Sequence, residues 1–255
     1  MNLKDLAYRT VDTLTGHTGL ERNISGERIR FPLRFSRYFP TDYEPETFKF
    51  LQDNLRPGDT FLDVGAHIGL FSVVGSRLVS PGGKVVSFEP TPYTRSVLEE
   101  MVELNGGGDT IQIRSEAVSA ARGKTTFYDT GEEISNANSL VHIDRGRSGI
   151  EVDLISIDEL AEEEGLKPAC IKIDVEGAEL DLLRGARKTF TQLRPAARLG
   201  LHPPQIRQNG QDLSEIWDLI TDYGFEPQRY GETLERDWFC SRENLFDVNL
   251  RPIAG

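Results

Sequence analysis

Two acidic residues and a glycine turn form the first group of residues that could bind a ligand. Gly65 and Gly69 bracket a five-residue turn, Asp63 precedes it by two positions, and Glu89 lies 20 residues beyond Gly69. Glycine allows positive φ angles and lets a ligand come close to the backbone. Dinucleotide-binding units place the acid that binds the ribose hydroxyls at the offset of Glu89. The pattern predicts a site for a nucleoside-containing cofactor.

The turn differs from the type that binds a pyrophosphate. Dinucleotide-binding turns read Gly-x-Gly-x-x-Gly, whereas Ala66 and His67 occupy the middle of this one. The negative charge of Asp63 would repel a pyrophosphate and suits a ligand with an ammonium and a sulfonium group. We therefore expect S-adenosylmethionine rather than NAD. The residues expected to contact it are Asp63, Gly65, Ala66, His67, Gly69, Glu89 and Asp174.

A second group of ionisable residues follows an apolar run that predicts a buried strand at residues 169–173. Lys172, Asp174, Glu176 and Glu179 cluster around the carboxyl end of this strand, where open α/β sheets bind ligands. Leaving such groups unpaired is costly, and helix capping explains one acid at most. The expected uses are substrate hydroxyl binding, general-base work or metal ligation.

His202 ends the next predicted strand, at residues 196–201. A histidine at this edge titrates near neutrality and can accept a proton from an alcohol. We expect catalytic roles for His202, Asp174 and Lys172, and a substrate contact by Glu176. A divalent metal held by Asp174 and Glu176 is an alternative that we do not expect, because no further ligand spacing supports it.

Alternating strands and helices must position these groups. The predicted strands span 60–64, 84–88, 111–114, 169–173, 196–201, 225–230 and 237–242, and the helices 70–79, 91–105, 213–223 and a stretch after Gly177. This alternation is typical of a doubly wound sheet with helices on both faces. Glu116 and Ala117 follow the third strand, beside the expected adenine site, so we expect both to contact the base.

The chain divides into an N-terminal extension or cap, residues 1–55, and a main domain, residues 56–255, with an insert at about 120–155. The extension is expected to hold a helix at 1–15, a connector at 16–26, an edge strand or hairpin arm at 28–35, an exposed aromatic segment at 37–40 and a helix at 44–55. In the insert, strands at 125–128 and 150–155 flank a polar loop. Asn138 and Ser139 in that loop are expected to contact the substrate.

Composition narrows the class of protein. The chain of 255 residues carries a net charge of −12, which argues against a nucleic-acid partner. No run approaches the ~20 apolar residues of a membrane span, and no secretory signal is visible. We therefore expect a cytoplasmic protein. The apolar face of residues 1–15 is expected to pack on the domain or, in a homodimer, against a second subunit.

The motifs together resemble the FkbM-type S-adenosylmethionine-dependent methyltransferases. They are DVGAHIG at 63–69, FEP at 88–90, KIDVEGAE at 172–179 and HP at 202–203. The resemblance implies a Rossmann-like class I methyltransferase fold, whose seven-stranded, mostly parallel sheet has an antiparallel last strand. It implies S-adenosylmethionine as donor, S-adenosylhomocysteine as product, and O-methylation of a hydroxyl, often on a sugar or a polyketide-type metabolite.

The resemblance also implies roles for single residues. The turn at Gly65 would hold the methionine moiety, Glu89 the ribose, and Asp174 and Glu176 would face the reaction centre. The chain departs from the family at Gly200, two residues before His202, where the family commonly has an acid. This departure argues against an acid–histidine pair.

Two other classes of protein remain open. An NAD(P)-dependent oxidoreductase is disfavoured by the missing middle glycine and by the absence of a Tyr-x-x-x-Lys pair near the site. A catalytically silent nucleotide-binding module would keep the fold without the reaction. The sequence thus favours an O-methyltransferase acting on a small-molecule hydroxyl, on a sugar or a glycosylated or polyketide-type metabolite.

Overall fold

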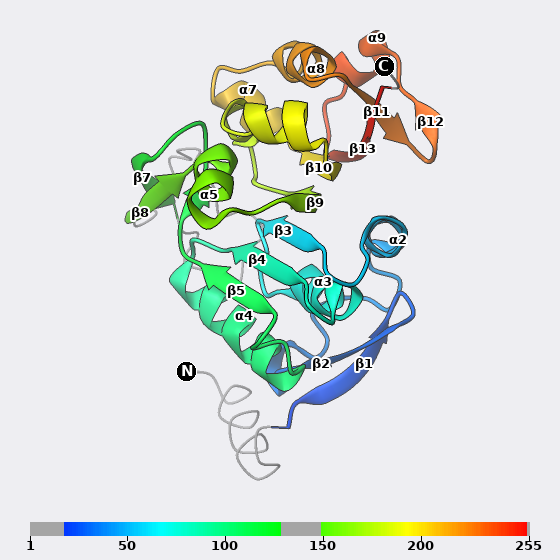
Figure 1. The fold of residues 1–255 in the computed structure, drawn as a ribbon, viewed down its shortest axis with the longest axis vertical. Helices are drawn as coiled ribbons and strands as arrows, with labels where there is room; N and C mark the ends of the chain where they lie inside the picture. The colour runs from blue at the N-terminus through cyan, green and yellow to red at the C-terminus, as the bar shows by residue number, and fades with distance from the viewer. Residues whose placement is uncertain (1–17, 129–148, 254–255) are drawn as a thin grey trace.

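An eight-stranded sheet forms the centre of the computed structural model, which describes residues 18–128 and 149–253 (Figure 1). Its strands run in the order β12-β11-β13-β10-β9-β3-β4-β5. Their bounds are β3 Thr60–Val64, β4 Lys84–Phe88, β5 Ile111–Arg114, β9 Pro168–Ile173, β10 Ala196–Leu201, β11 Phe225–Arg229, β12 Glu232–Thr233 and β13 Phe246–Pro252. Strands β5, β4, β3, β9 and β10 pair in parallel, and β13 lies antiparallel between β10 and β11. The predicted fold is confirmed, with the two-residue β12 as an additional strand.

Helices cover both faces of this sheet and enclose two cores. Neighbouring residues of a strand point to opposite faces, so Phe61 packs with α2, α3 and α4 while Leu62 packs with α5, α6 and α8. A sheet buried on both faces needs nearly continuous apolar strands, which is what the sequence provides. The helices are α2 Pro45–Asn54, α3 Leu70–Val79, α4 Pro92–Leu104, α5 Ile157–Glu164, α6 Glu179–Arg184, α7 Pro203–Gln208, α8 Leu213–Asp222 and α9 Arg236–Cys240.

The N-terminal part contains a hairpin, of which only the second arm was predicted from the sequence. Strand β1, Leu20–Ile24, pairs antiparallel with β2, Glu27–Phe31, so the predicted connector at 16–26 is wrong. A five-residue strand gains its stability from its partner, which a single segment does not reveal. The hairpin lies beside α3 and α4 (Figure 1). Its residues Ile24, Ile29 and Phe31 are buried in the same core as those helices.

The C-terminal part corrects a second prediction. Residues Arg236–Cys240 form helix α9, and the last strand is β13. The aromatic composition of this stretch favoured a strand, but Phe239 packs against Trp217 of α8 and Phe246 of β13, which a single turn of helix allows. The last strand was therefore predicted about ten residues too early in the chain. As a result Asp247, which lies opposite Gly200 of β10, was not recognised as a candidate site residue.

A small three-stranded sheet follows β5. It contains β6 Ala117–Val118, β7 Gly123–Tyr128 and β8 Gly149–Ile155, with β7 antiparallel to β8. The predicted strand pair of the insert is therefore confirmed. The expected N-terminal helix and the loop with Asn138 and Ser139 lie outside the described residues. Among the helices of residues 18–128 and 149–253, none combines the length and the apolar content needed to cross a membrane.

Candidate functional site

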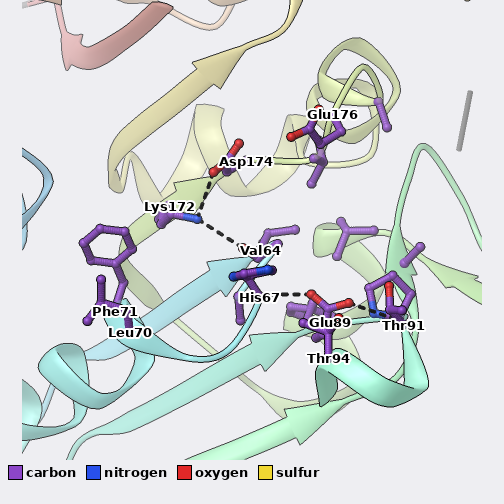
Figure 2. A pocket seen from close by; sticks show the side chains of 18 of the residues that line it. Val64, His67, Leu70, Phe71, Glu89, Thr91, Thr94, Lys172, Asp174 and Glu176 are labelled. Carbon is purple, nitrogen blue, oxygen red and sulfur yellow. Dashed lines mark hydrogen bonds and ion pairs between the residues drawn. The ribbon is translucent and has the colours of Figure 1, made fainter. Parts of the chain in front are cut away.

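The carboxyl ends of β3, β4, β9 and β10 open into one cavity of about 340 Å³. Most of the predicted site residues line it: Gly65, Ala66, His67, Glu89, Glu116, Ala117, Lys172, Asp174, Glu176 and His202. Asp63 and Gly69 do not line it. Figure 2 shows Glu89 on the β4 side of the cavity and Asp174 and Glu176 on the β9 side.

The two glycines of the turn serve different contacts. Gly65 has a φ of 76°, and a Cβ at this position would overlap the carbonyl oxygen of Asp174. Gly69 has a φ of 87°, and a Cβ there would overlap the side chain of Leu98 in α4. Glycine is therefore required at 65 for the approach of the turn to β9, and at 69 for the packing of α3 on α4.

Glu89 is the best-satisfied acid of the cavity. Its Oε2 accepts a hydrogen bond from the His67 N–H at 3.1 Å, and its Oε1 accepts one from the Thr91 N–H at 2.9 Å (Figure 2). Burial raises the pKa of the Glu89 carboxyl, although these bonds favour its charged form. The two amides fix the carboxylate while its remaining lone pairs stay available to a ligand with two hydroxyl donors.

Lys172 ties the glycine turn to the two neighbouring aspartates. Its Nζ donates to the Gly65 carbonyl at 3.2 Å and lies 3.6 Å from both Asp63 Oδ1 and Asp174 Oδ2. Burial alone would lower the pKa of Lys172, but Asp174 and Asp63 outweigh it and leave that pKa raised. A lysine held in its charged form positions the turn rather than accepting a proton.

Asp63 lies beneath the turn rather than in the cavity. It is fully buried, and its Oδ2 accepts a hydrogen bond from Ser72 Oγ at 2.6 Å. Burial raises the pKa of the Asp63 carboxyl, while Lys172 opposes that shift. The structure thus places Asp63 outside the cavity lining, where it supports the turn through Lys172.

On the β9 side, His202 meets three carboxylates. Its Nε2 lies 3.4 Å from Asp174 Oδ1 and 3.4 Å from Glu176 Oε1, and its Nδ1 lies 2.7 Å from Glu179 Oε1. The expectation that His202 lacks an acidic partner is therefore wrong. The partner comes from the first turn of α6, 23 residues away, instead of from position 200.

The pKa values of this group reflect its burial and its charges. Burial alone would lower the pKa of His202, but the hydrogen bond and the charge of Glu179, together with Asp174 and Glu176, raise it to about 9. Burial raises the pKa of Glu176 to about 7. Burial would also raise the pKa of Asp174, yet Lys172 and His202 outweigh it and leave that pKa lowered.

Because Gly200 has no side chain, the carboxylates of Asp174 and Asp247 can both lie close to its Cα. A Cβ at this position would lie 3.2 Å from Asp174 Oδ1 and 3.3 Å from Asp247 Oδ1. Asp247 lines the cavity and pairs with Arg198 Nη2 at 3.1 Å. The carboxylate that the family commonly carries on this strand is absent, and the neighbouring strand β13 contributes one.

One wall of the cavity comes from the N-terminal segment, which was expected to be an extension or a cap but in which no single site residue was predicted. Phe39, Tyr43 and Glu44 line the cavity, although residues 37–40 were expected to be exposed. The ring centroids of Phe39 and Tyr43 are 4.5 Å apart, and Tyr43 stacks on Phe71 at 6.4 Å. The aromatic residues near 40 were a signal for such a wall, but its partner α3 could not be identified from them.

Comparison with known proteins shows which family this chain matches. A family model described as the methyltransferase FkbM domain matches residues 63–227. The chain is 31% identical over 143 residues to the hexuronic acid methyltransferase AglP of Haloferax volcanii, which covers 56% of this chain and 56% of that protein. It is 22% identical over 229 residues to the 31-O-demethyl-FK506 methyltransferase FkbM of Streptomyces tacrolimicus, covering 79% and 84%.

The chain spans less than two thirds of the first curated relatives it matches, 56% and 59% of their lengths. Among solved structures, the methyltransferase FkbM of Methylobacillus flagellatus aligns at 14% identity and a TM-score of 0.49, over 81% of this chain and 51% of that one. A proposed rRNA methylase of Clostridium thermocellum aligns at 8% identity and a TM-score of 0.50, over 82% and 94%. At such low identity, the second likeness shows the fold alone.

Proposed function

Because this chain belongs to the FkbM methyltransferase family, we propose that it transfers the methyl group of S-adenosylmethionine to a hydroxyl of a small molecule. One observation carries the proposal. A single cavity joins a fixed carboxylate suited to a ribose, Glu89, to a histidine–carboxylate cluster on its far side. One end can hold a nucleoside, and the other can receive an alcohol.

The donor lies against the β3 and β4 side. Glu89 accepts hydrogen bonds from the two ribose hydroxyls, and the turn Gly65–Gly69 lies against the methionine moiety. Glu116 and the backbone of Ala117 lie beside the adenine. Glu116 forms an ion pair with Arg114, which lowers the pKa of the Glu116 carboxyl against the effect of its burial. The excess of acids in this cavity suits a donor that carries a positive sulfonium.

The acceptor lies against the β9 and β10 side, in the space bounded by Asp174, Glu176, His202 and the aromatic wall. An oxygen lone pair of the acceptor forms the new bond to the methyl carbon as the carbon–sulfur bond breaks. The electron pair of that bond stays on the sulfur, which becomes the neutral thioether of S-adenosylhomocysteine, and the hydroxyl proton passes to the carboxylates of the cluster. Holding the two reactants in line supplies most of the acceleration.

The acceptor that fits this space best is a sugar or a glycosylated or polyketide-type alcohol. Carboxylates accept hydrogen bonds from hydroxyl groups, and aromatic rings such as Tyr43 and Phe39 offer flat apolar surface to a ring face. The relatives point the same way, since one is a hexuronic acid methyltransferase and another acts on a demethyl-FK506. Residues up to 55 act as the cap over this space.

Calorimetric titration tests the proposal. Purified protein is titrated with S-adenosylmethionine, S-adenosylhomocysteine and NAD, and the titrations are repeated on Glu89→Ala. We expect both sulfur nucleosides to bind, NAD not to bind, and the binding to be lost in the variant. Methyl transfer to a panel of sugar and polyketide alcohols is then followed by mass spectrometry. Binding of NAD alone would indicate an oxidoreductase, and donor binding without transfer to any alcohol would indicate a silent module.

A further inference from the structure

Three side chains on the acceptor side of the cavity have the spacing of metal ligands. Asp174, Glu176 and His202 each offer one ligand atom, and these atoms all lie within 4.8 Å of one another. The imidazole Nε2 is 3.4 Å from a carboxylate oxygen of each acid. Ligand atoms that bind a first-row divalent cation at about 2.0–2.3 Å lie about 3–3.5 Å apart. The two distances from the imidazole to the carboxylates therefore match those expected around such an ion.

His202 points an unused nitrogen toward these two carboxylates. The residue is 3% exposed, and among the described residues its Nε2 has no hydrogen-bond partner. Leaving a buried polar atom without a partner is destabilising. A cation at the centre of the group would give Nε2, Asp174 and Glu176 a common partner.

Glu179 holds the imidazole in the orientation that a ligand needs. It is fully buried and accepts hydrogen bonds through Oε1 from His202 Nδ1 at 2.7 Å and from the Gly177 N–H at 3.1 Å. Histidines that bind metals usually donate their other ring N–H to a carboxylate or a carbonyl, which fixes the tautomer and directs the lone pair to the metal. The pair of Glu179 and His202 has this form.

The charge of the surroundings favours a cation as well. Four carboxylates share this ion-pair network with one lysine and one imidazole: Asp63, Asp174, Glu176 and Glu179 with Lys172 and His202. The acids exceed the bases even when both bases are charged. A divalent cation would balance this excess in a region where burial makes unpaired charge costly.

We propose that Asp174, Glu176 and His202 bind a divalent cation on the acceptor side of the cavity, with Glu179 as the positioning residue of His202. Two carboxylates and one imidazole suit Mn²⁺ and its neighbours among the first-row metals. Three protein ligands leave coordination positions open to an acceptor hydroxyl. Its proton would leave more easily once the oxygen is bound to the cation. This role in the reaction rests on the proposed function; the binding of the cation does not.

Mn²⁺ titration of the full chain, after removal of metals with a chelator, tests the site without any substrate. Electron paramagnetic resonance counts the free ion, and calorimetry gives the affinity. We expect one Mn²⁺ per chain. Asp174→Asn, Glu176→Gln and His202→Gln should each lose this binding, and Glu179→Gln should weaken it about 10- to 100-fold, as changes of such partners do. Asp174 and Glu176 are only partly buried, so their variants are expected to fold even where those of the buried His202 and Glu179 do not.

Glu44→Gln is the matched control, because Glu44 lines the same cavity and lies outside the ligand set. It removes one negative charge and should keep the Mn²⁺ site. Absence of Mn²⁺ binding by the unchanged protein, or equal loss of it in Glu44→Gln, would overturn the metal site. S-adenosylhomocysteine is titrated into the same samples. If the protein binds this nucleoside but not Mn²⁺, the metal site is contradicted and the methyltransferase proposal stands. If it binds Mn²⁺ but not the nucleoside, the methyltransferase proposal is contradicted and the metal site stands.

Discussion

The two sides of the cavity differ in how their carboxylates are held. On the β3 and β4 side, both carboxylate oxygens of Glu89 accept backbone hydrogen bonds. On the β9 and β10 side, His202 Nε2 and Glu179 Oε2 are buried without a hydrogen-bond partner among the described residues. On this first side Glu89 is fixed before a ligand arrives, although Asp63 Oδ1 and His67 Nε2 are also buried without a hydrogen-bond partner among the described residues. The second side instead gathers three carboxylates around one imidazole, as is common where chemistry takes place.

Replacing His202 should have the largest effect, and it should affect only the second side. His202→Ala is expected to lower turnover about 10²- to 10⁴-fold, the range that proton transfer and its electrostatic support contribute. The affinity for S-adenosylhomocysteine should change less than about threefold, because Glu89 and the turn do not contact the imidazole. Kinetics and calorimetry on the same variant measure both. Unchanged turnover would remove His202 from the reaction.

Replacing Glu89 should break the first side in the opposite way. Glu89→Ala removes the expected acceptor of two ribose hydroxyls and leaves the N–H groups of His67 and Thr91 without their carboxylate. Two hydrogen bonds to a charged group are worth about 3 kcal/mol, or about 100-fold in donor affinity. Glu44→Gln, on the acceptor wall, should leave donor affinity within about twofold. A donor bound equally well by Glu89→Ala would place the ribose elsewhere.

Gly65 joins the two sides, so a side chain there should damage both. In Gly65→Ala the new Cβ would overlap the carbonyl oxygen of Asp174, and the residue must also keep a φ of 76°. We expect a loss of about 3 kcal/mol in the free energy of unfolding, from overpacking and backbone strain together.

Gly82→Ala is the control for the strain alone, since Gly82 has a φ of 86° and no atom within 4 Å of its Cβ position. It should cost about 1 kcal/mol. Thermal unfolding of both variants measures the difference. Equal losses in the two variants would show that the contact with Asp174 contributes nothing.

His67 should make the smallest contribution, and it depends on pH. Burial and the charge of Lys172 lower the pKa of His67 to about 4. The unfolded chain therefore binds a proton between about pH 6.5 and 4 that the folded protein does not. The stabilisation is complete above pH 6.5 and is lost as the pH falls, by about 2 kcal/mol between pH 7 and pH 5.

Denaturant unfolding at several pH values measures this dependence, with His67→Asn as the comparison. Asparagine tolerates the positive φ of 53° at this position. The variant should lose less stability than the unchanged protein between pH 7 and pH 5, by about the same 2 kcal/mol. Parallel curves for the two proteins would contradict the shift. Buried acids with raised pKa values affect both proteins equally.

Local sequence patterns were enough to predict the β3 and β4 side of the cavity and the arrangement of the sheet. Gly65, Gly69 and Glu89 belong to one strand–turn–helix–strand unit, whose local spacing already fixes their relative positions. The parallel strands could be predicted because each contains apolar residues bounded by turn signals and most are separated from the next by an amphipathic helix. Such patterns depend on neighbouring residues, which a single sequence contains.

The β9 and β10 side of the cavity depends on contacts that exist only in the folded chain. Glu179 at the start of α6 contacts His202 at the end of β10, and Glu44 comes from the N-terminal segment. Asp247 comes from β13, a strand that was predicted at the wrong position. Asp63 was expected at the cofactor but lies beneath Lys172. These contacts join residues far apart in the chain, and they form because strand order and helix packing bring their ends together. No local spacing encodes that order.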